Sequence, residues 1–196
     1  MPGSVELTVV QYPGREDRIR EAPWTDAVAI AEHLAGLLAP DPRPLVLFGH
    51  SLGGTLGYEI ARRLPVRRLV VSARIAPTVP PARVFTGRTD DELAAQLHAL
   101  GGTSAEVLRH RELRDLLLPA FRADLRAADT YVHAPGPPLT CPVRLLLGAD
   151  DPAVARHDAE RWAEVTTGAF EVTTFEGGHF YLHDDPAAVV AEILRP

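Results

Sequence analysis

Three short segments hold the residue types that nucleophilic cleavage of an acyl bond requires. The first is Gly49-His50-Ser51-Leu52-Gly53, which matches the pattern G-x-S-x-G. It lies between a strand candidate at residues 45–48 and a helix candidate at residues 51–64. A serine on such a tight turn projects its hydroxyl above the sheet, where the positive end of the following helix favours developing negative charge. The alternative, an ordinary glycine-rich turn, is disfavoured by this strand-turn-helix context.

The second and third segments can activate that serine, because a serine hydroxyl is a weak nucleophile until a base removes its proton. His179 follows Gly177-Gly178 at the end of a strand candidate, and the two glycines permit a tight loop that brings its ring over Ser51. We predict that His179 acts as general base and then as general acid. Asp150 and Asp151 follow another strand candidate, and either acid can orient the imidazole.

Both acids also have structural interpretations. Asp150 can be a turn residue, and Asp151 can be the N-cap ahead of Pro152, which suits a first helical position. Asp151 can cap a helix and orient the imidazole at the same time only if each of its two carboxylate oxygens serves one of these roles. The chain order of serine, acid and histidine, each at the carboxyl end of a strand, predicts that the three meet at one edge of a parallel sheet.

The other histidines and the single cysteine carry weaker signals. We predict that His50 packs beside the sheet and faces away from the serine hydroxyl, and that His183 caps the last helix or lines the pocket rim. Cys141 is predicted to be buried packing rather than a nucleophile. We predict no metal and no cofactor, because the remaining histidines lack the spacing of metal ligands. These are His33, His98, His110, His133 and His157.

The surrounding elements predict an α/β fold, because short apolar runs alternate with amphipathic stretches. The predicted strands are residues 5–11, 45–48, 69–73, 143–147 and 170–175. The predicted helices are residues 24–38, 51–64, 152–165 and 185–194. Residues 90–131 are helical in pattern, with breaks at Gly101-Gly102 and Pro119, and they interrupt the alternation. We therefore expect a parallel sheet flanked by helices, with an inserted helical lid.

Composition excludes several functional classes. The net charge is −6 and no basic face is visible, which argues against nucleic-acid binding. One cysteine allows no intrachain disulfide, which fits a reducing compartment. The N-terminus lacks a signal-peptide pattern, and no apolar run is long enough to cross a bilayer. We predict a soluble, cytoplasmic monomer.

At these residues the chain resembles type II thioesterases of polyketide and nonribosomal peptide synthases, a family of the α/β-hydrolase superfamily. The resemblance extends beyond the predicted triad and runs from about Val5 to the C-terminus. The matching segments are Gln11-Tyr12-Pro13-Gly14-Arg15, Phe48-Gly49-His50-Ser51-Leu52-Gly53-Gly54, Leu100-Gly101-Gly102-Thr103, Arg122-Ala123-Asp124, and Gly177-Gly178-His179-Phe180-Tyr181-Leu182.

The resemblance implies hydrolysis of acyl thioesters held on the phosphopantetheine arm of an acyl or peptidyl carrier protein. It implies Asp151 rather than Asp150 as the acid, a hydrolase core at residues 1–76 and 136–196, and a lid at residues 77–135. Arg15 and Arg18 are candidates for carrier contact, with surface salt bridges as the alternative interpretation.

The sequence departs from the family at its N-terminal side. Family members have an earlier strand that ends in a His-Ala-Gly-Gly-like loop and supplies one of two oxyanion donors. No such motif is present, so only the amide of Leu52 can be assigned to the oxyanion hole. The missing strand would lie between residues 5–11 and 45–48, which predicts a gap in the sheet.

Three explanations of this departure stay open: a gene that begins upstream, which the intact triad favours, a fragment with altered strand pairing and weak activity, or a degenerate relative. The competing functions are a general esterase or acyltransferase on the same triad, and a module that binds carrier protein without turnover.

Overall fold

A computed structural model describes residues 5–80 and 87–196. Its sheet has four parallel strands in the order β1 (Val46–His50), β2 (Arg68–Ser72), β3 (Val143–Gly148) and β4 (Phe170–Phe175). The register pairs His50 with Ser72, and Gly148 with Phe175. All four strands therefore end at the same edge of the sheet. The predicted parallel α/β architecture is confirmed, and β4 has the predicted bounds.

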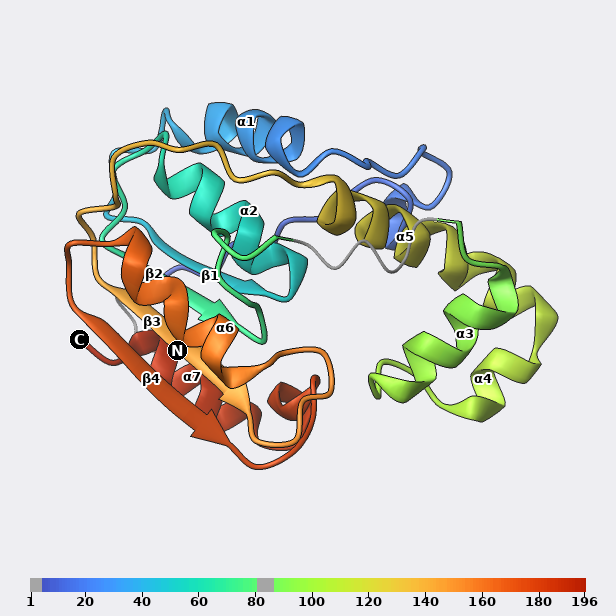
Figure 1. Cartoon of the computed structure of the whole chain (residues 1–196). Coiled ribbons are helices and arrows are strands. Elements are labelled where there is room, and N and C mark those ends of the chain that lie inside the picture. The colour runs from blue at the N-terminus through green and yellow to red at the C-terminus, as the bar shows by residue number, and fades with distance from the viewer. Residues whose placement is uncertain (1–4, 81–86) are drawn as a thin grey trace.

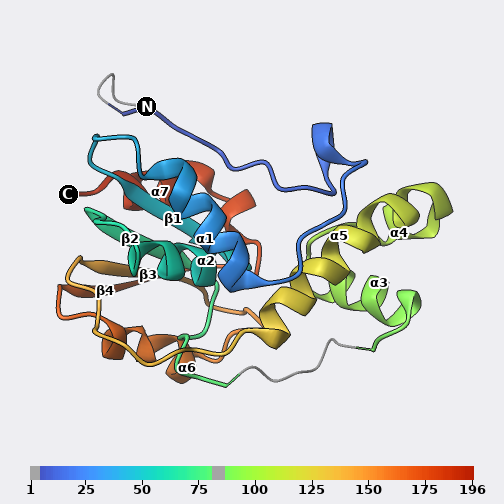
Figure 2. The ribbon, with the colours of Figure 1, turned by 90° about the horizontal axis from the view of Figure 1, so that it is seen from above.

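Helices cover both faces of the sheet, because successive strand side chains point to opposite sides. Val71 and Leu145 face one apolar cluster, where Tyr58 of α2 (Leu52–Ala61) and Trp162 of the 3-10 helix η2 (Arg161–Val165) pack. On the other face a second cluster includes Val70 and Leu146 of the strands, and Val189 of α7 (Pro186–Leu194). The helix α1 (Ala27–Leu38) packs on α2 through a further cluster, and α6 (Arg156–Glu160) precedes η2 (Figures 1 and 2).

The helical segment between β2 and β3 stands beside one end of the sheet (Figure 1). It comprises α3 (Asp90–Ala99), α4 (Ala105–Arg109) and α5 (Arg111–Thr130). The predicted break at Gly101-Gly102 is confirmed, since Gly101 adopts a φ of 81° between α3 and α4. The predicted break at Pro119 is wrong, because α5 runs through it. Leu118, Phe121 and Leu125 pack with α3 across the proline, and this packing outweighs the lost backbone hydrogen bond.

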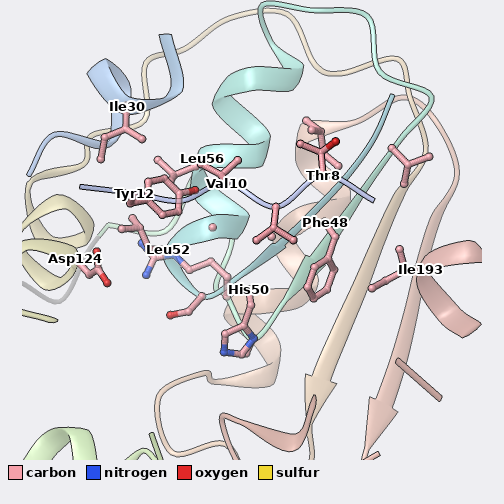
Figure 3. Close-up of a pocket in the computed structure, with 18 of the residues that line it drawn as sticks. Thr8, Val10, Tyr12, Ile30, Phe48, His50, Leu52, Leu56, Asp124 and Ile193 are labelled. Atoms are coloured by element: carbon pink, nitrogen blue, oxygen red, sulfur yellow. The ribbon is translucent and has the colours of Figure 1, made fainter. Parts of the chain in front are cut away.

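The predicted strand at residues 5–11 is also wrong. The chain there is extended but belongs to no strand, and Leu7 and Val9 are 67% and 77% exposed. An alternating apolar pattern favours an extended backbone, but a strand forms only where another edge accepts its hydrogen bonds. A cavity separates residues 5–10 from β1, and no backbone hydrogen bond crosses it in the described residues. Figure 3 shows Thr8 and Val10 on one side of this space and Phe48 on the other.

Candidate active site

Ser51 occupies a strained turn between β1 and α2. Its backbone has φ 52° and ψ −121°, a combination that non-glycine residues rarely adopt. The flanking glycine at 49 is required by space, since a Cβ there would lie 2.0 Å from the carbonyl oxygen of Gly53. Gly54 lets α2 approach β2 closely, because a Cβ there would lie 2.9 Å from Val71 Cγ1 of β2. The turn is thus built to bring helix, strand and serine close together.

Leu52 is the first residue of α2, directly after Ser51. Backbone amides in the first turn of a helix have no acceptor within the helix, and they lie at its positive end. The amide of Leu52 is therefore placed beside the serine as a donor for an oxyanion. This agrees with its assignment from the sequence, which stays a prediction.

Asp151 and His179 form a buried pair. Oδ2 of Asp151 lies 2.8 Å from Nδ1 of His179, and the two side chains are 1% and 6% exposed. The other oxygen, Oδ1, accepts a hydrogen bond of 2.8 Å from the amide of Ala153. Each oxygen therefore serves one partner, so Asp151 can orient the imidazole and bond a backbone amide at the same time. Asp150 is exposed, and its backbone amide donates to the carbonyl of Gly177.

The helix expected to start at Pro152 begins four residues later, at Arg156. Pro152 and Ala153 form a turn, and Ala155 before the helix is extended, with ψ 125°. The prediction of a helix over residues 152–165 is wrong at its start, and Asp151 stabilises this turn instead of capping a helix. Proline suits a first helical position but fits a turn equally well, so the sequence did not separate the two.

Ser51 and His179 line the same cavity, which has a volume of about 2250 Å³. No hydrogen bond joins the serine hydroxyl to the imidazole within residues 5–80 and 87–196. Such contacts are often long before substrate binds. The cavity is further lined by Leu52, by Phe180, and by Asp124 of α5. Figure 3 shows His50 and Leu52 at one side of this space and Asp124 beyond Leu52.

His50 was predicted to pack beside the sheet and to face away from the serine hydroxyl. It does contact the neighbouring strand, since its Nδ1 lies 3.0 Å from Ser72 Oγ. However, its ring centroid is also 5.0 Å from that of His179, and the residue lines the cavity. The direction of this ring relative to the serine hydroxyl stays a prediction, but its contact with the His179 ring was not expected. The strained turn at Ser51 brings the preceding side chain toward the histidine loop, and no sequence pattern indicated this contact.

The other singled-out side chains have structural partners. His133 bonds the hydroxyl of Tyr58 at 3.0 Å, and His183 stacks on Phe180. Asp185, not His183, caps α7 by accepting from the amide of Ala188. Cys141 is buried, as predicted. No group of three His, Cys, Asp or Glu side chains that could hold a metal ion occurs in the described part of the chain.

Arg15 and Arg18 both form salt bridges, as the structural interpretation expected. Arg15 contacts Asp124 of α5 at 2.7 Å, and Arg18 contacts Glu21 at 2.6 Å. The first bridge joins the N-terminal segment to the helical segment. No helix within residues 5–80 and 87–196 has both the length and the apolar character to cross a bilayer.

A parallel sheet with helices on both faces, a serine on a strained strand-to-helix turn, and an acid–histidine pair at the neighbouring strand ends together define an α/β-hydrolase. The chain belongs to the thioesterase domain family, whose family model matches residues 1–195.

Individual relatives agree with this family. The chain is 40% identical to a probable cadicidin biosynthesis thioesterase of Streptomyces griseus, over 99% of this chain and 55% of the relative. It is 40% identical to the thioesterase PikA5 of Streptomyces venezuelae, over 92% of this chain and 67% of that protein. The solved structure of the type II thioesterase BorB from the borrelidin biosynthetic cluster is 44% identical, with a TM-score of 0.84, over 94% of this chain and 80% of that one. The chain thus spans just over half the length of the S. griseus relative.

Proposed function

We propose that this protein hydrolyses acyl thioesters carried on the phosphopantetheine arm of an acyl or peptidyl carrier protein. Ser51 is the nucleophile, His179 the general base and acid, Asp151 the orienting acid, and the Leu52 amide an oxyanion donor. One observation carries the proposal: His179, paired with the buried Asp151, lines the same cavity as a serine whose backbone is strained.

The reaction follows from the chemistry of these groups. Nε2 of His179 takes the proton of Ser51 Oγ as the oxygen attacks the thioester carbonyl. The Leu52 amide and the positive end of α2 stabilise the resulting oxyanion. His179 then gives its proton to the departing thiolate sulfur, which leaves as a free thiol, and the acyl group stays on Ser51 as an ester. A water molecule, deprotonated by His179, attacks this ester; the bond to Oγ breaks, His179 returns the proton to Ser51, and the acid is released. Throughout, Asp151 stabilises the imidazolium and fixes its tautomer.

The substrate class rests on the relatives together with the cavity. The two matched Streptomyces proteins are named thioesterases, one of cadicidin biosynthesis, and BorB comes from a borrelidin biosynthetic cluster. The cavity extends from the space between residues 5–10 and β1 to the helical segment, where Leu97, Leu100 and Phe121 contribute apolar side chains to it. Such a lining suits an acyl chain. We also propose that residues 77–135 act as the lid of a core at 1–76 and 136–196, and that the protein works as a cytoplasmic monomer.

The test uses the 196-residue chain with an acyl-pantetheine thioester and an acylated carrier protein as substrates. We expect release of free acid by the wild-type chain and none by Ser51→Ala. Ser104→Ala is the matched control, because Ser104 only caps α4. Equal turnover by Ser51→Ala would reject the proposal. So would binding of carrier protein without acyl release, or a clear preference for oxygen esters or for alcohol and amine acceptors over water.

A further inference from the structure

Behind the acid–histidine pair lies a row of three hydrogen-bonded polar side chains. The hydroxyl of Tyr181 is 2.6 Å from Ser72 Oγ, and Ser72 Oγ is 3.0 Å from Nδ1 of His50. Each comes from a different element: the 3-10 helix η3 (Tyr181–His183), the end of β2, and the end of β1. Ser72 and Tyr181 are 0% and 1% exposed. The row therefore links the histidine loop to the serine turn through the interior of the protein.

Both ends of the row adjoin reactive residues. His50 directly precedes Ser51, and Tyr181 follows His179 by two positions. Moreover, the His50 ring lies 5.0 Å from the His179 ring at 60°, and 5.3 Å from Phe180. His179 is thus held by the Asp151 carboxylate at Nδ1 and flanked by the His50 ring.

His50 suits this place because it stays uncharged. The pKa of His50 is lowered to about 3, mainly by burial of the ring and secondly by the nearby His179. A charged neighbour 5.0 Å away would oppose the imidazolium that His179 must form. A neutral imidazole can still bond Ser72 through Nδ1, which a hydrocarbon side chain of similar size cannot do.

We propose that Tyr181, Ser72 and His50 form a positioning device that fixes the His179 ring relative to Ser51. The inference rests on the proposed function for its kinetic consequence. These are positioning residues, since the row acts through His179 and contributes no proton to the reaction. The competing interpretation is that the row is a buried polar network of the core that stabilises the fold and nothing else.

The kinetic test compares Tyr181→Phe, Ser72→Ala and the double variant. The phenylalanine keeps the ring stacked 5.0 Å from Phe175 and removes only the hydroxyl. We expect kcat to fall about two- to tenfold in each single variant with KM unchanged, in keeping with the loss of one hydrogen bond. The double variant should be no slower than the slower single one, because the row acts as a unit. Effects that multiply would overturn the proposal.

Tyr58→Phe is the matched control. Tyr58 is 2% exposed, and its hydroxyl bonds an imidazole, Nε2 of His133, at 3.0 Å, away from the acid–histidine pair. We expect this variant to lose stability comparably and to keep its kcat. If Tyr58→Phe and Tyr181→Phe lower kcat alike, the row has no special role and the proposal fails.

A spectroscopic test is independent of turnover. The proton on Nδ1 of His179, bonded to Asp151, should give a downfield proton NMR signal that disappears in His179→Gln. We expect faster exchange of this proton with water in Tyr181→Phe and Ser72→Ala, and no change in Tyr58→Phe. Unchanged exchange in all three variants would overturn the positioning role. Absence of thioester hydrolysis by the wild-type chain would defeat the proposed function instead, while this measurement still decides the role of the row.

Discussion

The carboxylate of Asp151 bonds two groups at once, the Nδ1 of His179 through Oδ2 and the amide of Ala153 through Oδ1, both at 2.8 Å. The hydrogen bond from Ala153 keeps the carboxylate from rotating. Because Oδ1 is held by a backbone amide, the position of Oδ2 opposite His179 is also fixed. With the side chain 1% exposed, no water competes for the histidine. The orientation of His179 is therefore set by backbone geometry at the end of β3.

Asp151→Asn should remove this orientation at nearly constant shape. An asparagine has only one accepting oxygen, so it cannot accept from both His179 Nδ1 and the amide of Ala153. It also does not stabilise an imidazolium, so we expect kcat to fall about 10³- to 10⁴-fold. The measurement is steady-state hydrolysis of an acyl-pantetheine thioester. Asp150→Asn is the control, since Asp150 is exposed and adjacent. Activity lost with Asp150→Asn and retained with Asp151→Asn would exchange the two roles.

The histidine loop approaches the end of β3 so closely that no side chain fits between them. A Cβ on Gly148 would lie 2.2 Å from the carbonyl oxygen of Gly178 and 2.7 Å from that of Gly177. Gly148→Ala should therefore displace the loop that carries His179, lower stability by about 1–3 kcal/mol, and lower kcat. Thermal unfolding and hydrolysis measure the two effects.

Gly36→Ala provides the matched control for this substitution. Gly36 lies within α1, with no atom within 4 Å of an added Cβ. The same change there should raise stability by about 0.5–1 kcal/mol, because alanine favours a helix over glycine. A fully active Gly148→Ala variant of normal stability would contradict the close approach of loop and strand.

The sequence predicted the elements where apolar runs are bounded by clear turn residues. The strand β4 matches its predicted bounds, and the turn around Ser51 was identified with its neighbouring glycines. The strand prediction for residues 5–11 failed because a strand depends on a partner edge elsewhere in the chain, which no local pattern specifies. The break at Pro119 failed for a similar reason, since packing of α5 on α3 overrides local preference.

The sequence predicted only part of the candidate site, because it shows local features and not contacts between distant segments. Strand ends are local features, so Ser51, His179 and a choice of two acids were identifiable. The contact of His50 with His179 depends on how two loops 129 positions apart meet, as does the row through Ser72 and Tyr181. Only three-dimensional structure supplies such contacts.

The salt bridge between Arg15 and Asp124 should couple the N-terminal segment to α5. Two hydrogen bonds of 2.7 and 3.2 Å join the side chains, which are 33% and 34% exposed. Burial raises the pKa of Asp124, and Arg15 opposes that rise. In a double-mutant cycle of Arg15→Ala and Asp124→Ala, we expect a coupling free energy of about 1 kcal/mol in thermal or urea unfolding.

A second cycle with Arg18→Ala and Glu21→Ala serves as the comparison. That pair lies three residues apart in one exposed segment, so it should show a coupling near zero. Equal coupling in both cycles would argue against a specific link between the N-terminal segment and α5.

The buried His50 should make the protein less stable in acid. Its pKa is about 3 in the folded state, mainly because of burial, against about 6.5 in an unfolded chain. Above pH 6.5 the ring is neutral in both states and contributes nothing. Between these two values only the unfolded chain binds the proton, so the free energy of unfolding falls as pH falls, by up to about 1.4 kcal/mol per pH unit.

Replacing His50 with glutamine removes this proton uptake. We therefore expect the difference in unfolding free energy between wild type and His50→Gln to be constant above pH 6.5. Below that pH it should shift in favour of the variant, until the shift levels off near pH 3. Urea unfolding at pH 8, 6, 5 and 4 measures this difference in unfolding free energy. The contributions of groups that titrate alike in both proteins cancel in the difference. His110→Gln, at an exposed position, should run parallel to wild type throughout. A His50→Gln curve that also runs parallel to wild type would mean that His50 takes up its proton in the folded protein as readily as in the unfolded chain.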